Sequence, residues 1–206
     1  MALTHVIASA FCGFARLLTG VRALWLGCQP DARPRVYYAN HRSHGDFLVI
    51  WASLPPALRE RTRPVAGADY WLRGNLRRYL IEQIFRGVLI DRQAGRSADP
   101  IGIMGQPLMA GESLILFPEG TRNLDDGLLP FKSGIYYLAQ AHPEVELIPV
   151  WIENLGRTMP KGSVIPIPLL CTLRFGAPLV LREGESRDEF LQRCRDALVS
   201  LALPAE

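Results

Sequence analysis

Short apolar runs alternate with longer, helix-like stretches along most of this 206-residue chain. The runs have the length of strands and are apolar almost throughout, as expected when both faces of a sheet are covered. Strands that alternate with helices predict a fold of the α/β class, with a largely parallel central sheet flanked by helices. The expected strands span residues 36–39, 64–66, 87–90, 113–117, 146–151 and 170–175.

The segments between these runs predict helices over residues 47–54, 70–85, 98–109, 132–142 and 187–202. Pro55 and Pro56 end the first helix, because proline does not continue a helix interior. Ser186 and Glu189 form a capping-box pattern at the start of the last helix. The chain has no internal repeat or evident linker, and its 49% apolar and 21% charged residues are typical of a folded protein. Its length then favours a single domain.

The first 28 residues differ in composition from the rest of the chain. Their apolar stretch begins at Val6 and is interrupted by Arg16 and Arg22, so it falls short of the ~20 residues that a membrane-crossing helix needs. On a helical wheel the two arginines share one arc with other polar residues. The opposite arc holds Val6, Ile7, Phe11, Phe14, Leu17, Leu18, Val21, Leu24 and Trp25.

This wheel predicts an amphipathic helix in a membrane interface, with arginines toward headgroups and aromatic rings toward acyl chains. A terminal helix docked on the domain's own core gives the same pattern. Gly13 and Gly20 favour a division of the segment into two short helices. We therefore expect a membrane-associating segment at residues 1–30 and one folded domain at residues 31–206.

The distribution of charged and thiol groups limits the possible partners. The net charge of +3 is too small to indicate nucleic-acid binding. Arginines gather at residues 59–63 and 73–78, which suits either an anionic surface or a solvated face. The cysteines lack C-x-x-C or zinc-ligand spacing, so they indicate a reducing compartment rather than a disulfide framework or a metal site. The four are Cys12, Cys28, Cys171 and Cys194.

The first polar cluster, Asn-His-Arg-Ser-His-Gly-Asp at residues 40–46, directly follows the strand at residues 36–39. His41 and Asp46 fit a general base whose imidazole is held in one tautomer by a carboxylate. Ser43 and Asp46 also fit a capping box, in which Asp46 only satisfies the start of the next helix. His44 lies three residues after His41, but two histidines without a further ligand are a weak indication of a metal.

The second polar cluster, Phe-Pro-Glu-Gly-Thr-Arg at residues 117–122, follows another apolar strand. The planar fork of Arg122 suits an anionic group, and Glu119 lies on the same turn. An ordinary turn with a surface arginine fits these residues as well. Arg92 follows the strand at residues 87–90 and is either part of the same site or a solvated charge beside Asp91.

The three clusters are expected to meet, because ligands in open α/β sheets bind outside the carboxyl ends of the strands. The chain lacks a G-x-S-x-G nucleophile elbow and the glycine-rich motifs of dinucleotide and P-loop sites. What remains is a base without an evident protein nucleophile. Such a base would activate a substrate hydroxyl directly.

These residues are specific enough to indicate a family. Asn40-His41-x-x-x-x-Asp46, together with the cluster at residues 117–122, closely resembles the glycerophospholipid acyltransferases, and above all the bacterial 1-acyl-sn-glycerol-3-phosphate acyltransferases. The segments at residues 87–92, 131–134 and 148–150 are also similar, so the resemblance spans residues 36–152 in the right order.

The resemblance implies that His41 is the catalytic base and Asp46 its partner. His41 would take the proton from the free glycerol hydroxyl of lysophosphatidate, which attacks an acyl thioester to give phosphatidate. The acceptor would be bound by residues that match the family's binding positions, and the arginines among them would hold the phosphate. These residues are Arg92, Glu119, Gly120, Thr121 and Arg122.

The resemblance further implies no metal and no bound cofactor, since acyl-CoA or acyl carrier protein is a co-substrate. It implies a peripheral enzyme on the cytoplasmic face of a bacterial inner membrane, where the lysophospholipid acceptor resides. Acylation of another lysolipid, such as a lyso-ornithine lipid, needs the same base but no phosphate grip. A lipid-binding module without turnover would not need His41 and Asp46, and a phosphoester hydrolase would need a metal or nucleophile that the motifs do not provide.

Overall fold

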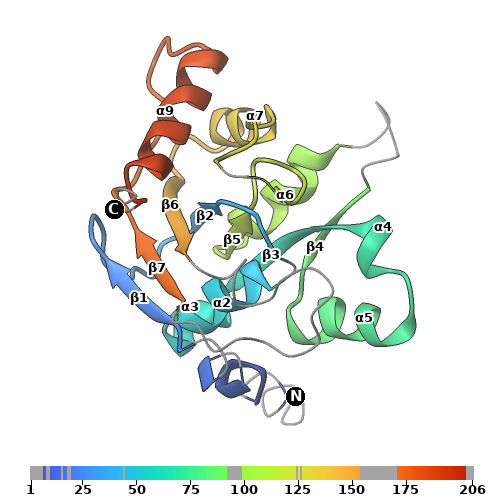
Figure 1. Cartoon of the computed structure of the whole chain (residues 1–206). Coiled ribbons are helices and arrows are strands. Elements are labelled where there is room, and N and C mark those ends of the chain that lie inside the picture. The colour runs from blue at the N-terminus through green and yellow to red at the C-terminus, as the bar shows by residue number, and fades with distance from the viewer. Residues whose placement is uncertain are drawn as a thin grey trace.

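The computed structural model describes residues 7, 10–14, 16–17, 20–43, 45–91, 99–123, 125, 127–153 and 171–202. Within this part of the chain, seven strands form one sheet in the order β1-β7-β6-β2-β5-β3-β4 (Figure 1). The strands are β1 (Arg22–Trp25), β2 (Arg35–Ala39), β3 (Thr62–Gly67), β4 (Val88–Ile90), β5 (Ser113–Leu116), β6 (Glu146–Glu153) and β7 (Thr172–Phe175). The helices are α2 (Asp46–Ser53), α3 (Pro56–Arg59), α4 (Ala68–Trp71), α5 (Asn75–Tyr79), η1 (Leu80–Ile84), α6 (Pro100–Met109), α7 (Gly134–Ala141) and α9 (Arg187–Val199).

The sheet is parallel over most of its width. Strands β6, β2, β5, β3 and β4 pair in parallel with their neighbours. Strand β7 is antiparallel to β6, and β1 is parallel to β7, so one edge of the sheet runs in the opposite direction. The predicted α/β class with a largely parallel sheet is confirmed. All six predicted strands form, with small shifts at their ends.

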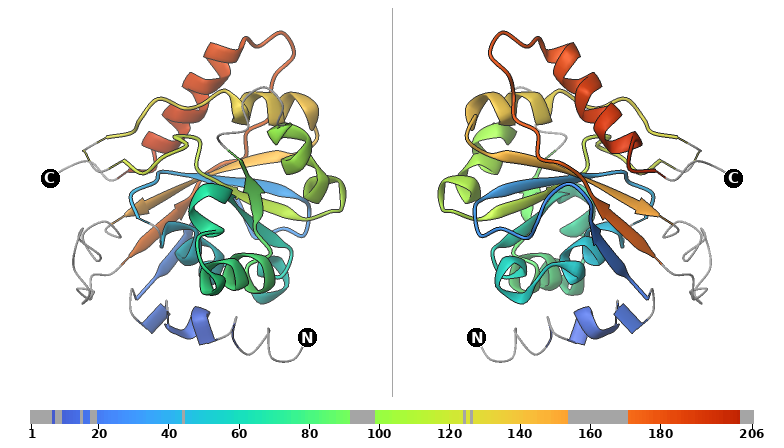
Figure 2. Two further views of the ribbon diagram at one scale, coloured as in Figure 1. Left: turned by 90° about the vertical axis from the view of Figure 1, so that its right-hand side faces the viewer. Right: turned by 90° about the vertical axis from the view of Figure 1, so that its left-hand side faces the viewer.

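Helices cover both faces of the sheet (Figure 2). Successive side chains of a strand point to opposite faces, and β2 shows this division within four residues. Tyr37 and Ala39 join a core that includes residues of α2 and η1. Val36 and Tyr38 join a second core with α6, α7 and α9. Because all four side chains are at most 1% exposed, β2 forms the centre of the molecule.

The helix predicted at residues 70–85 is wrong in its continuity. The structure divides this segment into α4, α5 and the π-helical turn η1. Gly74 lies between α4 and α5 with a φ of 99°, a backbone conformation outside any right-handed helix and open to glycine. The capping box predicted for the last helix is confirmed, because the Ser186 and Glu189 side chains each accept the other residue's backbone N–H.

The N-terminal helical segment ends before Trp25, and of the two predicted breaks only the one at Gly20 occurs. Ile7, residues 10–14, Arg16 and Leu17 are helical, so Gly13 does not interrupt the helix. Gly20, with a φ of 52°, donates its N–H to the Arg16 carbonyl oxygen and ends the helical turn. Residues 22–25 then form strand β1, because the edge of β7 offers unpaired backbone groups to pair with.

The N-terminal helical residues contact the domain on one side only. Phe11 packs edge-on against Phe85, at 5.8 Å between ring centroids, and Arg16 donates from Nε and Nη2 to the carbonyl oxygen of Ala52 near the end of α2. Phe14 and Leu17 are 60% and 87% exposed. Docking on the core therefore accounts for part of the predicted apolar arc. In the described residues, no helix has the length and hydrophobicity that crossing a bilayer requires.

Candidate active site

The two polar clusters lie at the same edge of the sheet, as predicted. Strands β2 and β5 are parallel neighbours, so the loops after Ala39 and Leu116 leave the sheet side by side. The Asn123 N–H donates to the His41 carbonyl oxygen at 2.7 Å and ties the loops together. The Asn40 side chain exchanges two hydrogen bonds with the backbone of Ile152, at 2.7 and 3.0 Å, which anchors the first loop to β6.

The imidazole of His41 is held by the carboxylate of Asp46. Nδ1 of His41 lies 2.8 Å from Oδ2 of Asp46, and the Asp46 residue is only 1% exposed. A carboxylate accepts hydrogen bonds, so Nδ1 carries the proton and Nε2 keeps its lone pair. The side chain of His41 is 19% exposed and lines a cavity, so a basic nitrogen is available to a bound molecule.

The Asp46 carboxylate also organises the loop around it. Oδ2 accepts the backbone N–H groups of Arg42 and Ser43 at 2.7 and 2.9 Å. The contact with Ser43 is one half of the capping box that the sequence predicts. The other half is absent, since Gly45 is the N-cap of α2 and donates its N–H to Ser43 Oγ at 3.2 Å. The same carboxylate therefore folds the turn and orients the imidazole.

Phe117 fixes the plane of the imidazole. The two rings stack with centroids 4.2 Å apart and planes inclined by 19°. His41 is thus held along one edge by Asp46 and over one face by Phe117. The protein itself thus fixes the orientation of the ring.

Glu119 does not have the position predicted for an acceptor-binding residue. Its carboxylate is buried, with 1% of the residue exposed, and it does not line the cavity. Oε1 accepts the backbone N–H of His41, and Oε2 accepts the backbone N–H of Leu129, both at 2.8 Å. Both oxygens are used inside the protein, so Glu119 positions the loop of His41.

Gly120 and Thr121 lie where the sequence places them, on the tight turn after β5. Gly120 has a φ of 72°, and its N–H donates to the Phe117 carbonyl oxygen at 3.0 Å. A Cβ at this position would lie 3.3 Å from Cγ of Lys132, so both the conformation and the space favour glycine.

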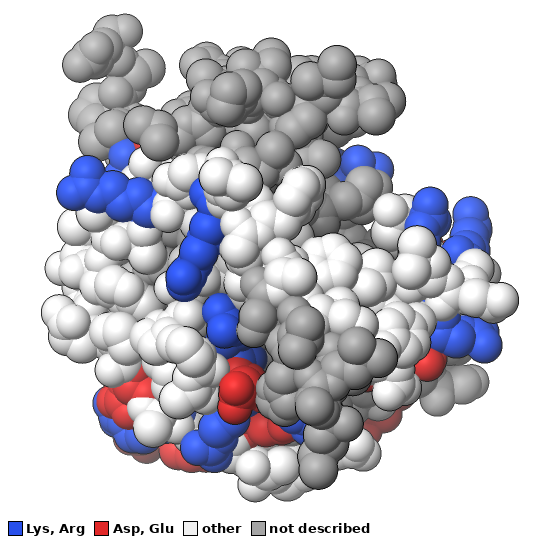
Figure 3. All heavy atoms as spheres, turned by 90° about the horizontal axis from the view of Figure 1, so that it is seen from below, with Lys and Arg blue, Asp and Glu red and all other residues white. Residues whose placement is uncertain are grey.

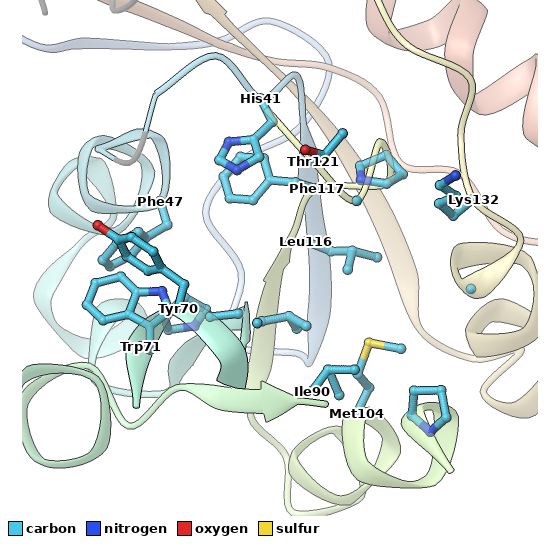
Figure 4. Close-up of a pocket in the computed structure, with 18 of the residues that line it drawn as sticks. His41, Phe47, Tyr70, Trp71, Ile90, Met104, Leu116, Phe117, Thr121 and Lys132 are labelled. Atoms are coloured by element: carbon cyan, nitrogen blue, oxygen red, sulfur yellow. The ribbon is translucent and has the colours of Figure 1, made fainter. Parts of the chain in front are cut away.

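A cavity of about 360 Å³ opens beside His41. Thr121, Arg122 and Lys132 line it together with His41. Figure 4 shows His41, Thr121 and Lys132 along one side of the cavity. Apolar side chains form the rest of the wall, and they include Phe47, Trp71, Ile81, Ile90, Met104 and Leu116. The arrangement combines an imidazole, two cationic side chains and an apolar surface. The predicted Arg92 lies outside the described residues.

Lys132 was not among the residues predicted for the site. It is one of only two lysines in an arginine-rich chain, and it lies in a segment that already resembles the family, so a sequence signal existed. Its backbone N–H donates to the Pro118 carbonyl oxygen at 2.7 Å, which holds the start of α7 against the turn of Gly120. The six apolar lining residues named above come from six different elements, and no local pattern brings them together.

The chain is similar to known proteins in sequence. The chain is 34% identical over 184 residues to mouse 1-acyl-sn-glycerol-3-phosphate acyltransferase alpha, covering 85% of this chain and 60% of the mouse protein. It is 34% identical over 128 residues to 1-acyl-sn-glycerol-3-phosphate acyltransferase of Salmonella typhimurium, covering 58% of this chain and 46% of that protein. The chain thus spans about half to three fifths of these curated relatives.

The fold matches that of a solved bacterial structure. The crystal structure of the 1-acyl-sn-glycerophosphate (LPA) acyltransferase PlsC from Thermotoga maritima superposes with a TM-score of 0.74 and covers 94% of this chain and 76% of that chain. At 21% sequence identity, this likeness shows a shared fold. Residues 28–153, which include both polar clusters, match the family model named Acyltransferase. The chain therefore belongs to the acyltransferase family.

Proposed function

We propose that this protein is a 1-acyl-sn-glycerol-3-phosphate acyltransferase. It would transfer a fatty acyl group from an acyl thioester to the free hydroxyl of lysophosphatidate and so form phosphatidate. One observation carries the proposal: His41, backed by Asp46 at 2.8 Å, lines the same cavity as Arg122 and Lys132. A base and a cationic pair in one cavity suit a hydroxyl substrate that carries a phosphate. The names of the curated relatives support the same acceptor.

The reaction follows from the free lone pair on Nε2 of His41. This nitrogen takes the proton of the acceptor hydroxyl while the hydroxyl oxygen attacks the thioester carbonyl carbon. The tetrahedral intermediate expels the thiolate as the carbon–sulfur bond breaks, and the imidazolium returns the proton to that sulfur. The Asp46 carboxylate, 2.8 Å from Nδ1, stabilises the imidazolium between these two steps.

The phosphate of the acceptor would be held by Arg122 and Lys132. Both side chains are exposed at the cavity, where solvent and ligand can reach them. Arginine offers two parallel hydrogen bonds to a phosphate, and lysine offers a compact point charge. Two cations at this cavity favour a phosphate-bearing acceptor over an uncharged lysolipid. By the family resemblance, Arg92 would add a third.

The apolar wall would receive an acyl chain. Trp71, Ile90 and Met104 lie across the cavity from His41 (Figure 4). Burial of each methylene contributes about 0.8 kcal/mol, so a chain in this position would help hold the reacting carbonyl in place. The acyl donor would be acyl-CoA or acyl carrier protein as a co-substrate, with no resident metal or cofactor. Because acceptor and product are bilayer lipids, the enzyme would work at a membrane surface, on its cytoplasmic face.

An acceptor panel tests the proposal directly. Purified protein is incubated with a labelled acyl thioester and either lysophosphatidate, lysophosphatidylcholine or a lyso-ornithine lipid, and the products are identified by mass. We expect phosphatidate as the main product. His41→Ala should lower kcat by roughly 100- to 10,000-fold, the range for loss of a general base. Transfer by His41→Ala at a rate near that of the wild type would refute the base assignment.

Arg122→Gln tests binding of the acceptor phosphate separately from the role of His41. We expect the KM for lysophosphatidate to rise by about 10- to 100-fold, since hydrogen bonds to charged groups contribute about 1.5–3 kcal/mol. Arg182→Gln, an exposed arginine near the start of α9, is the matched control and should leave this KM unchanged. An equal KM for all three proteins would favour an acceptor without a phosphate.

A further inference from the structure

Helix α5 presents an unusual combination of side chains to solvent. Residues 73–79 are all exposed, and they include Leu76, which is 72% exposed, and Tyr79, which is 39% exposed. A single exposed leucine is normal in a folded protein. Here the apolar side chains stand among three arginines, Arg73, Arg77 and Arg78, within one short segment.

The segment is anchored from the opposite side. Ile81 and Ile84 of η1, the turn that follows α5 directly, are 0% and 6% exposed and belong to the core. Leu76 and Tyr79, by contrast, are exposed and do not belong to the core. The turn η1 thus anchors the segment in the protein, while the apolar side chains of α5 remain in solvent. A surface helix that packs only on its own domain has polar residues at such positions.

Arg73, just before α5, and Arg78, within it, are exposed to an external partner. Ion pairs between described residues use other arginines, such as Arg63 with Glu112 and Arg193 with Glu185. The guanidinium of Arg77 lies 4.6 Å from the centroid of Tyr70, a ring that lines the cavity. Helix α5 therefore touches the wall of the candidate active site while its outer face remains uncovered.

Other exposed apolar residues lie at the same end of the molecule. The N-terminal helical residues, with the exposed Phe14 and Leu17, and helix α5 both lie at the lower end of Figures 1 and 2. Figure 3 views this end directly and shows basic side chains gathered on its right, the side on which α5 lies in Figure 1. Apolar and aromatic side chains among arginines are typical of segments that rest in the interface of an anionic bilayer.

We propose that the exposed segment at residues 73–79, which includes α5, docks on an anionic lipid surface through Arg73, Leu76, Arg78 and Tyr79. Leu76 and Tyr79 enter the interface, and the arginines bind lipid phosphates on either side. This contact is separate from the N-terminal helix, and it places the cavity wall at Tyr70 next to the bilayer. Exposure and charge would favour this docking whether or not the protein transfers acyl groups. An acidic carrier protein is the rival partner for a basic face, but the exposed Leu76 and Tyr79 favour lipid.

Vesicle co-sedimentation of the full chain tests the proposal. The probes are vesicles of phosphatidylcholine with and without phosphatidylglycerol. Arg73→Gln/Arg78→Gln should lower the partition coefficient for the anionic vesicles by roughly 10- to 30-fold, given about 1 kcal/mol per arginine near the surface. The loss should shrink at high salt, where charges are screened. Arg182→Gln/Arg187→Gln, at the start of α9 and at the opposite end of the molecule, is the charge-matched control and should bind as the wild type does.

Leu76→Gln tests the contribution of apolar side chains to vesicle binding, and Met109→Gln on α6 is its control. The two side chains are almost equally exposed, at 72% and 73%, but α6 packs on the other face of the sheet. Leu76→Gln should lower binding to both kinds of vesicle by about 5- to 10-fold, and Met109→Gln should not.

Unchanged vesicle binding in the α5 variants, or an equal loss in their controls, would overturn the proposal. So would a loss of binding to an acidic carrier protein with vesicle binding intact. Acyl transfer to a short-chain acceptor dissolved as monomers should not change in Arg73→Gln/Arg78→Gln. If that acyl transfer is absent in the wild type while vesicle binding follows the prediction, the proposed reaction fails and the docking face stands.

Discussion

The backbone N–H of His41 donates to Oε1 of Glu119 at 2.8 Å, so the two sequence clusters meet through the main chain of one and the buried carboxylate of the other. The second oxygen of Glu119 accepts the N–H of Leu129. Arg195 of α9 donates to the Leu129 carbonyl oxygen at 3.0 Å. A continuous set of hydrogen bonds thus runs from α9 to the loop that carries His41.

Glu119→Gln should impair turnover more than acceptor binding. The amide keeps one acceptor oxygen and turns an NH₂ group toward a backbone N–H, so one buried donor loses its partner. We expect the free energy of unfolding to fall by about 1–3 kcal/mol, and kcat to fall because the loop of His41 shifts. Urea unfolding and steady-state kinetics check this. A higher KM for lysophosphatidate at constant kcat and stability would instead mean that Glu119 contacts the acceptor.

Asp46→Asn should leave the fold largely intact and slow the reaction. The amide oxygen can still accept the N–H groups of Arg42 and Ser43, but the negative charge beside Nδ1 of His41 is lost. The imidazolium of the reaction is then less stable, and we expect kcat to fall by about 100-fold or more with little change in KM. Circular dichroism serves as the folding control. Near-normal kcat in a folded variant would show that Asp46 serves only the turn.

Stability should decrease as pH rises above 9, partly because of Cys171. Burial, aided by the nearby Asp46 carboxylate, raises the pKa of this fully buried thiol from 9.0 to about 12. Between these values the unfolded thiol is ionised and the folded one is not, so the unfolded state binds fewer protons. The free energy of unfolding then falls by up to about 1.4 kcal/mol per pH unit for this group.

Urea unfolding from pH 8 to 11 measures this slope. Cys171→Ala should be less stable at pH 8, because a buried sulfur is removed, and should show a shallower decline above pH 9. Burial also raises the pKa of Cys194 to about 12, so a residual slope is expected in the variant. The same slope in variant and wild type would mean that Cys171 does not contribute.

Deletion of residues 1–28 should destabilise the domain, because it removes strand β1 as well as the N-terminal helical residues. Trp25 stacks on Phe175 with ring centroids 4.0 Å apart, and β1 pairs with β7 over four residues. Trp25 is partly buried, so its loss should cost somewhat less than the about 3–5 kcal/mol of a fully buried aromatic side chain, and we expect a fall in Tm of roughly 4–12 °C for a chain of this size. Thermal unfolding of the truncated protein measures it.

A double substitution in the N-terminal helical residues tests their membrane binding without removing strand β1. Phe14→Ser/Leu17→Ser changes two exposed side chains, so we expect an unchanged Tm and weaker binding to vesicles. Wild-type vesicle binding by this variant would argue against the predicted interfacial role of the segment. A lower Tm would show that the two side chains pack on the domain.

The amino-acid sequence was sufficient to predict the strands β2 to β7, the parallel character of the sheet and the edge at which His41 and the turn of Glu119 meet. These features follow from local information: the period of apolar residues marks each strand, and the carboxyl ends of parallel strands share one edge. The contact between His41 and Asp46 was predictable for the same reason, because the two residues are five positions apart on one turn.

Tertiary structure alone decided the features that depend on which segments meet. Residues 22–25 have an apolar pattern that suits a helix, but the open edge of β7 makes them a strand. Glu119 lies on a turn whose residues suit ligand binding. In the structure, however, both of its carboxylate oxygens accept backbone N–H groups, from His41 and Leu129. Lys132 reaches the cavity because α7 packs beside the turn of Gly120. The local sequence sets the period of the apolar residues and the edge at which each loop leaves the sheet. A side chain's partners, by contrast, come from segments distant in the chain.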